Sequence, residues 1–196
     1  ALARPARRTG NRVADVVREI FDDVQARGGA AVTDWAIRLD GSAPRRVLID
    51  DKAVEAARGQ LAPADTRAIR IAAENVRLFH QMTVPADTPL IETTPGVTSR
   101  LVWRPIGAAG LYVPGGTAPL FSSLLMLAIP AGVAGVATRV AVTPPSKSGD
   151  IHPAMIIAAA EAGLEAIWLL GGAQAIAALT FGVTLDEGEI PACDKR

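Results

Sequence analysis

Apolar residues at helical spacing dominate the first half of the chain. They recur every three to four positions and are interrupted by glycine, aspartate or proline. This pattern predicts helices at residues 11–28, 30–39, 52–61 and 63–82. Residues 47–49 are a short apolar run that predicts a strand. We therefore expect residues 1–97 to form a mainly helical region.

The pattern changes near residue 97. Residues 84–96 contain three prolines and predict a linker or a sheet edge. Beyond them, short β-rich runs alternate with amphipathic or apolar segments. Strands are predicted at 98–103, 106–113, 138–143 and 166–170, and helices at 119–134, 152–162 and 173–181. Pro130 is expected to kink or end the first of these helices. The tail, residues 182–196, is polar and predicts turns.

Alternation of strand and helix is typical of a parallel sheet with right-handed crossovers. We therefore predict an α/β fold in which residues 98–196 form the sheet. One plan occurs twice within it: an apolar strand, a glycine pair and a helix, at residues 111–120 and 167–176. In a parallel sheet both turns lie at the carboxyl edge, where open α/β sheets bind ligands.

The two glycine pairs define the candidate site. We call Gly115–Gly116 the first glycine turn and Gly171–Gly172 the second glycine turn. A helix that starts directly after such a turn presents free N–H groups to an anionic ligand. Each pair is equally compatible with a tight turn that contacts no ligand. Neither belongs to a G-x-G-x-x-G sequence, so the standard dinucleotide-binding fingerprint is absent.

Two polar side chains flank these turns. Tyr112, the only tyrosine, ends a predicted strand, where it could pack at the edge of the core or lie against a ring or ribose of a ligand. Gln174 falls in the first turn of an otherwise apolar helix. Its amide could be exposed, could cap the helix, or could bind a ligand as both donor and acceptor.

Composition excludes several other functions. Lys plus Arg and Asp plus Glu each number 20, and the net charge near zero argues against a nucleic-acid or membrane-surface binder. The apolar stretch at 120–137 contains Pro130 and two glycines, so it predicts a core helix rather than a membrane span. A single cysteine, Cys193, indicates a reducing cytoplasm and no internal disulfide. His80 and His152 stand at no metal-ligand spacing. The residues therefore predict a ligand crevice without evident proton-transfer or metal machinery.

Two longer motifs resemble a known family. Residues 104–106 (RPI) and 110–122 (GLYVPGGTAPLFS) form the first, and residues 171–179 (GGAQAIAAL) form the second. Together with Asp194–Lys195 near the end, they are similar to the histidinol dehydrogenase family. The similarity extends over essentially the whole chain, including the helical part.

This resemblance implies an NAD- and zinc-dependent enzyme of histidine biosynthesis. Such enzymes oxidise L-histidinol to L-histidine through an aldehyde, in two hydride transfers. The implied fold is of the aldehyde-dehydrogenase-like class, with incomplete Rossmann-like domains, in an intertwined homodimer. The family's NAD-contacting tyrosine and glutamine match Tyr112 and Gln174. We therefore expect an NAD site formed by these two residues with Gly115, Gly116, Gly171 and Gly172.

The sequence also departs from the family pattern. Family members are much longer and continue after the Asp-Lys pair into a Gly-Pro-Gly-Asn loop. Their zinc ligands and catalytic Glu-His pair lie beyond that point, so no catalytic or metal-binding residue can be assigned here. We expect a truncated enzyme that is inactive alone and assembles as a dimer or larger species through exposed apolar surface. The alternatives are a non-catalytic nucleotide-binding or assembly module, and a relative whose parent oxidises another small alcohol.

Overall fold

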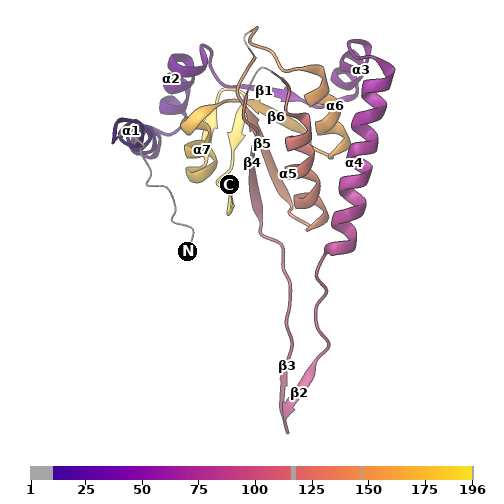
Figure 1. The fold of residues 1–196 in the computed structure, drawn as a ribbon. Coiled ribbons are helices and arrows are strands. Elements are labelled where there is room, and N and C mark those ends of the chain that lie inside the picture. The colour runs from indigo at the N-terminus through magenta and orange to yellow at the C-terminus, as the bar shows by residue number, and fades with distance from the viewer. Residues whose placement is uncertain (1–10, 116–117, 147, 196) are drawn as a thin grey trace, which may run out of the picture.

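The computed structural model describes residues 11–115, 118–146 and 148–195 (Figure 1). Its centre is a four-stranded sheet in the order β1-β6-β5-β4. The strands are β1 (Arg45–Leu48), β4 (Ala108–Tyr112), β5 (Thr138–Thr143) and β6 (Ala166–Leu169). Helices cover both faces, and a two-stranded arm projects far from the body.

The sheet is mixed, which corrects the prediction of a parallel sheet. Strands β4, β5 and β6 are parallel as expected, but β1 pairs antiparallel with β6, with Arg45 opposite Leu169 and Leu48 opposite Ala166. A strand added at a free edge can run either way, because its side chains alternate identically in both directions. The direction of β1 was therefore not readable from its four residues.

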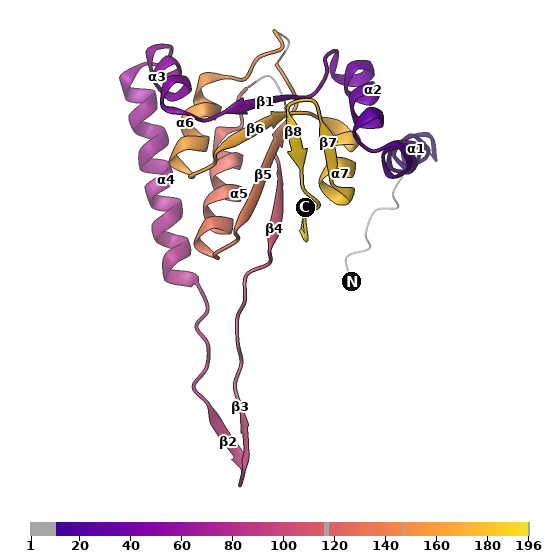
Figure 2. The same cartoon turned by 180° about the vertical axis from the view of Figure 1, so that it is seen from behind.

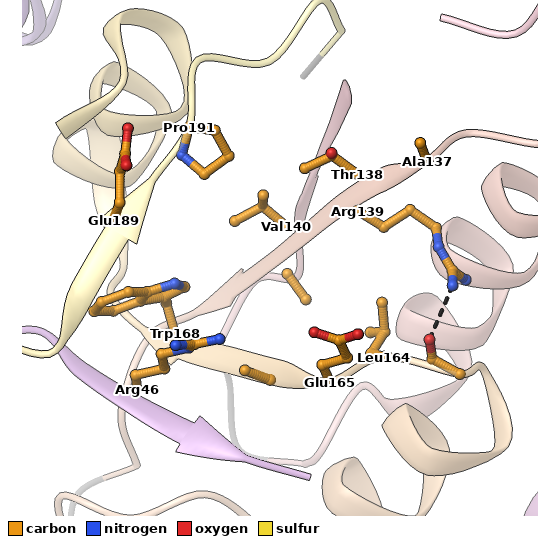
Figure 3. A pocket seen from close by; sticks show the side chains of 13 residues that line it. Arg46, Ala137, Thr138, Arg139, Val140, Leu164, Glu165, Trp168, Glu189 and Pro191 are labelled. Atoms are coloured by element: carbon orange, nitrogen blue, oxygen red, sulfur yellow. Dashed lines mark hydrogen bonds between the residues drawn. The ribbon is translucent and has the colours of Figure 1, made fainter. Parts of the chain in front are cut away.

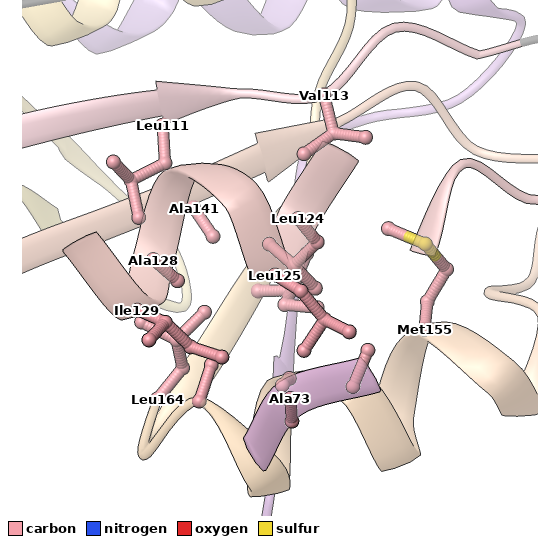
Figure 4. Close-up of a cluster of buried hydrophobic side chains, with 14 of the residues drawn as sticks. Ala73, Leu111, Val113, Leu124, Leu125, Ala128, Ile129, Ala141, Met155 and Leu164 are labelled. Atoms are coloured by element: carbon pink, nitrogen blue, oxygen red, sulfur yellow. The ribbon is translucent and has the colours of Figure 1, made fainter. Parts of the chain in front are cut away.

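Four helices lie on one side of the sheet: α3 (Asp51–Gly59), α4 (Pro63–Thr83), α5 (Phe121–Val133) and α6 (Pro153–Glu161). Helix α5 packs on the strands, and α3 and α4 pack against α5 and α6 as a further layer. Leu111 and Ala141 of the strands face Leu124 and Ala128 of α5 in this core (Figure 4). Pro130 lies inside α5, which continues to Val133, so of the two expected effects of this proline, a kink or an end, the end is excluded.

Helices α1 (Asn11–Arg27), α2 (Gly29–Asp40) and α7 (Gly172–Phe181) cover the opposite face. The alternate strand positions, Val140, Val142 and Trp168, point into this second core. Strands β5 and β6 are buried on both faces, between the two cores. Successive positions along them are therefore apolar, without the alternation of a half-exposed strand.

The tail is more ordered than predicted. It forms an antiparallel hairpin of β7 (Val183–Leu185) and β8 (Gly188–Ile190), visible from behind in Figure 2. Val183 and Ile190 pair across it and are buried in the second core. Cys193, which belongs to this tail, is buried there too. Three-residue strands carry too little pattern to be distinguished from turns by sequence alone.

The arm consists of residues 84–107, with β2 (Ile91–Thr94) and β3 (Val97–Ser99) at its tip (Figures 1 and 2). The strand predicted at 98–103 ends at Ser99. Beyond it, one backbone bond, from Thr88 N to Leu101 O at 3.0 Å, joins the two segments of the arm, and side chains accept from two further backbone amides. The Thr88 hydroxyl accepts from Leu101 N at 2.8 Å, and the Asp87 carboxylate accepts from Trp103 N at 2.8 Å. This N–H, aided by Arg104, holds the pKa of Asp87 below its usual value.

The end of the described chain lies beside β4: Gly110 N donates to Lys195 O at 2.7 Å, and the Asp194 carboxylate accepts from Gly107 N and Ala108 N at 2.8 and 3.0 Å. Of the helices that the structure describes, none is long and apolar enough to span a membrane.

Candidate functional site

The carboxyl ends of the parallel strands bring the described members of the predicted site to one edge of the sheet. Tyr112 ends β4, the second glycine turn follows β6, and Gly115 lies three residues beyond β4. The backbone N–H of Gly172 donates to the Tyr112 hydroxyl at 3.3 Å, which joins segments 60 residues apart. The predicted placement at a shared edge is thus confirmed for these residues. Gly116 lies outside the described residues.

The two glycine turns differ in how they meet the following helix. Gly171 is the N-cap of α7, and the helix begins at Gly172, one residue before the predicted start at 173. Helix α5 begins only at Phe121, six residues after Gly115. A helix start directly after the glycine pair, expected at both turns, therefore exists only at the second glycine turn.

Gln174 is fully buried beneath the second glycine turn. Its exposed fraction is 0%, so an exposed amide is ruled out. Its Nε2 donates to Asp40 Oδ2 at 3.1 Å, while Oε1 has no hydrogen-bond partner among the described residues. A buried acceptor without a partner costs about 1–3 kcal/mol, so it calls for a functional explanation.

Asp40 also belongs to this site, although the sequence analysis assigned it no functional role. It ends α2, and its Oδ2 also accepts from Gly171 N at 2.9 Å. A carboxylate at the last position of a helix is unfavourable for that helix dipole, whereas at the start of α7 it is favourable. An aspartate directly before the helix-ending Gly41 was the signal that could have marked it.

The glycines of both turns are constrained by space. A Cβ built on Gly115 would lie 3.1 Å from Pro144 Cγ, and one on Gly171 would lie 2.7 Å from the same atom. Pro144 follows β5 and therefore sits between the two turns. Gly172 has a φ of +60°, and a Cβ there would lie 2.5 Å from Gln174 Oε1. The second glycine turn thus leaves no room for side chains.

A pocket of about 180 Å³ opens beside the first glycine turn. Its lining includes Gly115, Pro119, Thr143, His152 and Met155. His152 caps α6, with Nδ1 accepting from Ala154 N at 3.1 Å, which gives this histidine a structural task. The pocket lies between the loops that follow β4 and β5, at the edge where open α/β sheets bind ligands.

A second pocket, of about 290 Å³, lies at the opposite edge, near the amino ends of β5 and β6 (Figure 3). Arg46, Glu165, Trp168 and Glu189 line it. Arg139, also in its lining, donates to Ala162 O and Gly163 O at 2.9 Å each and so ties down the end of α6. None of the predicted site residues that the structure describes lines this pocket.

The titratable residues offer little metal chemistry. Within residues 11–115, 118–146 and 148–195, no group of three or more His, Cys, Asp or Glu side chains is placed to hold a metal ion. The arrangement at the carboxyl edge provides instead a phenol, two glycine turns and a buried amide. It can bind a ligand by stacking, close backbone approach and hydrogen bonds.

Known proteins share both the sequence and the fold. A family model described as histidinol dehydrogenase matches residues 3–195. A histidinol dehydrogenase of Deinococcus radiodurans is 46% identical over 196 residues, covering 99% of this chain and 43% of that protein. One from Xanthomonas euvesicatoria pv. vesicatoria is 38% identical over 195 residues, covering 100% and 44%.

A solved structure gives the same result in three dimensions. The crystal structure of histidinol dehydrogenase from Elizabethkingia anophelis matches with a TM-score of 0.81 and 34% identity. The match covers 96% of this chain and 42% of that one. The chain therefore spans less than half the length of the relatives it matches.

Proposed function

Because the chain belongs to the histidinol dehydrogenase family, we propose that it forms the NAD-contacting part of an enzyme that oxidises L-histidinol to L-histidine. The observation that carries this proposal is the contact of the Tyr112 hydroxyl with Gly172 N at 3.3 Å. It places the two family motifs at one edge of the sheet. NAD, when bound, accepts the hydride from the substrate.

The residues at this edge fit a nucleotide. The Tyr112 ring, half-buried at the end of β4, offers a flat surface for a ribose or base. Gly115, Gly171 and Gly172 lack the Cβ atoms that would keep a ligand away from the backbone. Gln174 lies directly below, with one unsatisfied amide oxygen. NAD hydroxyl and amine groups are donors that match such an acceptor.

The family's zinc does not fit the described part of this chain. No described group of His, Cys, Asp or Glu side chains could hold it there. We therefore assign no zinc ligand and no catalytic residue here, and no step of the proposed function runs through zinc.

Calorimetry with NAD tests the proposal on the 196-residue chain. We expect binding that is clearly weakened, but still measurable, in Tyr112→Ala and Gln174→Ala, because both changes remove polar groups of the site. Gln81→Ala, an exposed glutamine on α4, is the control and should bind like the wild type. Absence of binding at millimolar NAD, or an equal loss in the control, would contradict the proposal.

A turnover assay tests whether the 196-residue chain has catalytic activity of its own. We expect the 196-residue chain, supplied with L-histidinol, NAD and zinc, to form no NADH above the buffer rate. NADH formation that survives repurification would show that this chain carries chemistry of its own. Turnover with another small alcohol would instead favour a different substrate for the parent enzyme.

The second candidate function is a non-catalytic assembly module, and the arm favours it. Large apolar side chains there are exposed, among them Leu90 at 63%, Leu101 at 55% and Trp103 at 51%. An isolated two-stranded hairpin is marginal in water, so such a surface favours association. We propose a homodimer or larger assembly. A monodisperse monomer in sedimentation at micromolar concentration would count against it.

The remaining assignments follow from the family. We propose that the fold is of the aldehyde-dehydrogenase-like class, with residues 98–196 as an incomplete Rossmann-like NAD-binding domain and 1–97 as the helical part of the first domain. The three parallel strands, with helices on both faces, support this. We propose a cytoplasmic location, in keeping with a single buried cysteine.

A further inference from the structure

We propose that Asp40 is a positioning residue of the nucleotide site, which fixes the orientation of the Gln174 amide without touching the ligand. The proposal rests on the proposed NAD function for its effect on affinity. The contact itself can be tested without NAD.

The chemistry of Asp40 decides which way the amide points. An ionised carboxylate is an acceptor only, so the group of Gln174 that faces it must be the donor, Nε2. The distance from Nε2 to Asp40 Oδ2 is 3.1 Å. Oε1 therefore faces away from Asp40. With any neutral donor in place of the carboxylate, the amide could turn over and present nitrogen instead.

Oε1 lies under the second glycine turn. A Cβ built on Gly172 would be 2.5 Å from this oxygen, so the amide fills the space that the glycine leaves open. Within the part of the chain that the structure describes, Oε1 has no hydrogen-bond partner, and the side chain is completely buried. The site is thus preset to accept a hydrogen bond. The matching ligand group is a donor, such as a hydroxyl or amine, that reaches this oxygen after a small opening of the turn.

Asp40 also holds the turn itself. Its Oδ2 accepts from Gly171 N at 2.9 Å, and the next amide, Gly172 N, donates to the Tyr112 hydroxyl. A chain of contacts therefore runs from Asp40 through the second glycine turn to Tyr112. The end of α2 in this way sets the positions of two predicted nucleotide contacts that lie far away in sequence.

A double-mutant cycle on the NAD dissociation constant tests this role. We expect Asp40→Ala to weaken binding about tenfold and Asp40→Asn about threefold, since the asparagine keeps one oxygen but no longer dictates the amide orientation. In a Gln174→Ala background, Asp40→Ala should add only a small further loss. A role confined to general stability would give additive losses, which would overturn the proposal.

The control is Asp34→Asn, which removes the same charge from the same helix. Asp34 is exposed and pairs with Arg27 at 2.8 Å, away from the site, so NAD affinity should not change. Thermal unfolding of every variant separates loss of fold from loss of affinity. If Asp40→Ala does not fold, Asp40→Asn replaces it in the double-mutant cycle with Gln174→Ala.

Side-chain amide signals in NMR test the contact without a ligand. In the wild type, the Gln174 NH₂ protons should exchange slowly, and Gln174→Ala identifies their signals. Asp40→Ala or Asp40→Asn should speed this exchange, and Asp34→Asn should not. If the wild type fails to bind NAD, the proposed function is wrong. The amide exchange rates then still show whether Asp40 holds the Gln174 amide in place. Unchanged protection in the Asp40 variants would overturn its positioning role.

Discussion

The two glycine turns share one sequence plan but have different surroundings. At the second glycine turn, Gly171 N is held by Asp40, Gly172 N by Tyr112, and the space below is filled by Gln174. At the first glycine turn, Gly115 is exposed and lines a pocket of about 180 Å³, and a Cβ built on it would lie 3.1 Å from Pro144 Cγ. One turn is closed by the protein, and the other is open.

This difference bears on the anion-binding site that is expected where a helix starts after a glycine turn. The start of α7 already has a carboxylate, that of Asp40, on its first free amide. A ligand phosphate would have to compete with this built-in anion. The pocket beside the first glycine turn is open, but it also contains a carboxylate, that of Asp150, which pairs with Arg45 at 2.8 Å. The second glycine turn is better suited to hydrogen bonds with neutral groups.

Gly172→Ala should have the largest effect on stability. The φ of +60° strains any residue with a Cβ, and the new methyl would lie 2.5 Å from Gln174 Oε1. We expect the free energy of unfolding to fall by about 2–4 kcal/mol. Urea denaturation followed by circular dichroism measures it. A loss below about 1 kcal/mol would mean that the second glycine turn is loosely packed.

Gly171→Ala comes next. Its φ of −108° suits any residue, so only crowding matters, and the methyl would meet Pro144 Cγ at 2.7 Å and Asp40 Oδ1 at 2.9 Å. We expect a loss of about 1–3 kcal/mol. The same denaturation curves give the value, and a variant as stable as the wild type would contradict the close packing at Pro144.

Tyr112→Phe should have a smaller effect. It keeps the ring and removes only the acceptor for Gly172 N, in a hydrogen bond that is long at 3.3 Å. We expect a loss of about 0.5–1.5 kcal/mol, or less where water replaces the hydroxyl. Faster amide exchange at Gly172, with Gly171 unaffected, would identify the cause. Loss of protection at both amides would show that Tyr112 supports the whole turn.

Gly115→Ala should have the smallest effect and is the matched control for the other glycines. Its methyl would lie 3.1 Å from Pro144 Cγ, which demands a small shift, while the loss of glycine freedom in the unfolded chain offsets part of the cost. We expect the free energy of unfolding to stay within about 0.5 kcal/mol of the wild type. A loss comparable to that of Gly171→Ala would remove the distinction between the open and the closed turn.

Much of the fold was predictable because it depends on local patterns. The long helix at 63–83 and the buried strand at 138–143 agree closely with their predicted ranges, since apolar spacing over many residues is a strong signal. The direction of β1, the β7–β8 hairpin and the early end of β3 were not predictable. Each depends on a partner segment of the chain, as with the Asp87 and Thr88 side chains, which accept from Trp103 N and Leu101 N beyond Ser99.

The candidate site divides in the same way. The sequence by itself determined that two glycine turns follow parallel strands, and therefore that Tyr112 and the second glycine turn share one edge. Only the tertiary structure decided that Gln174 is buried with a free oxygen, and that Asp40 holds it. Periodicity reports which face of an element is buried. It carries no information on which distant carboxylate, 131 residues away from Gly171, will meet the start of a helix.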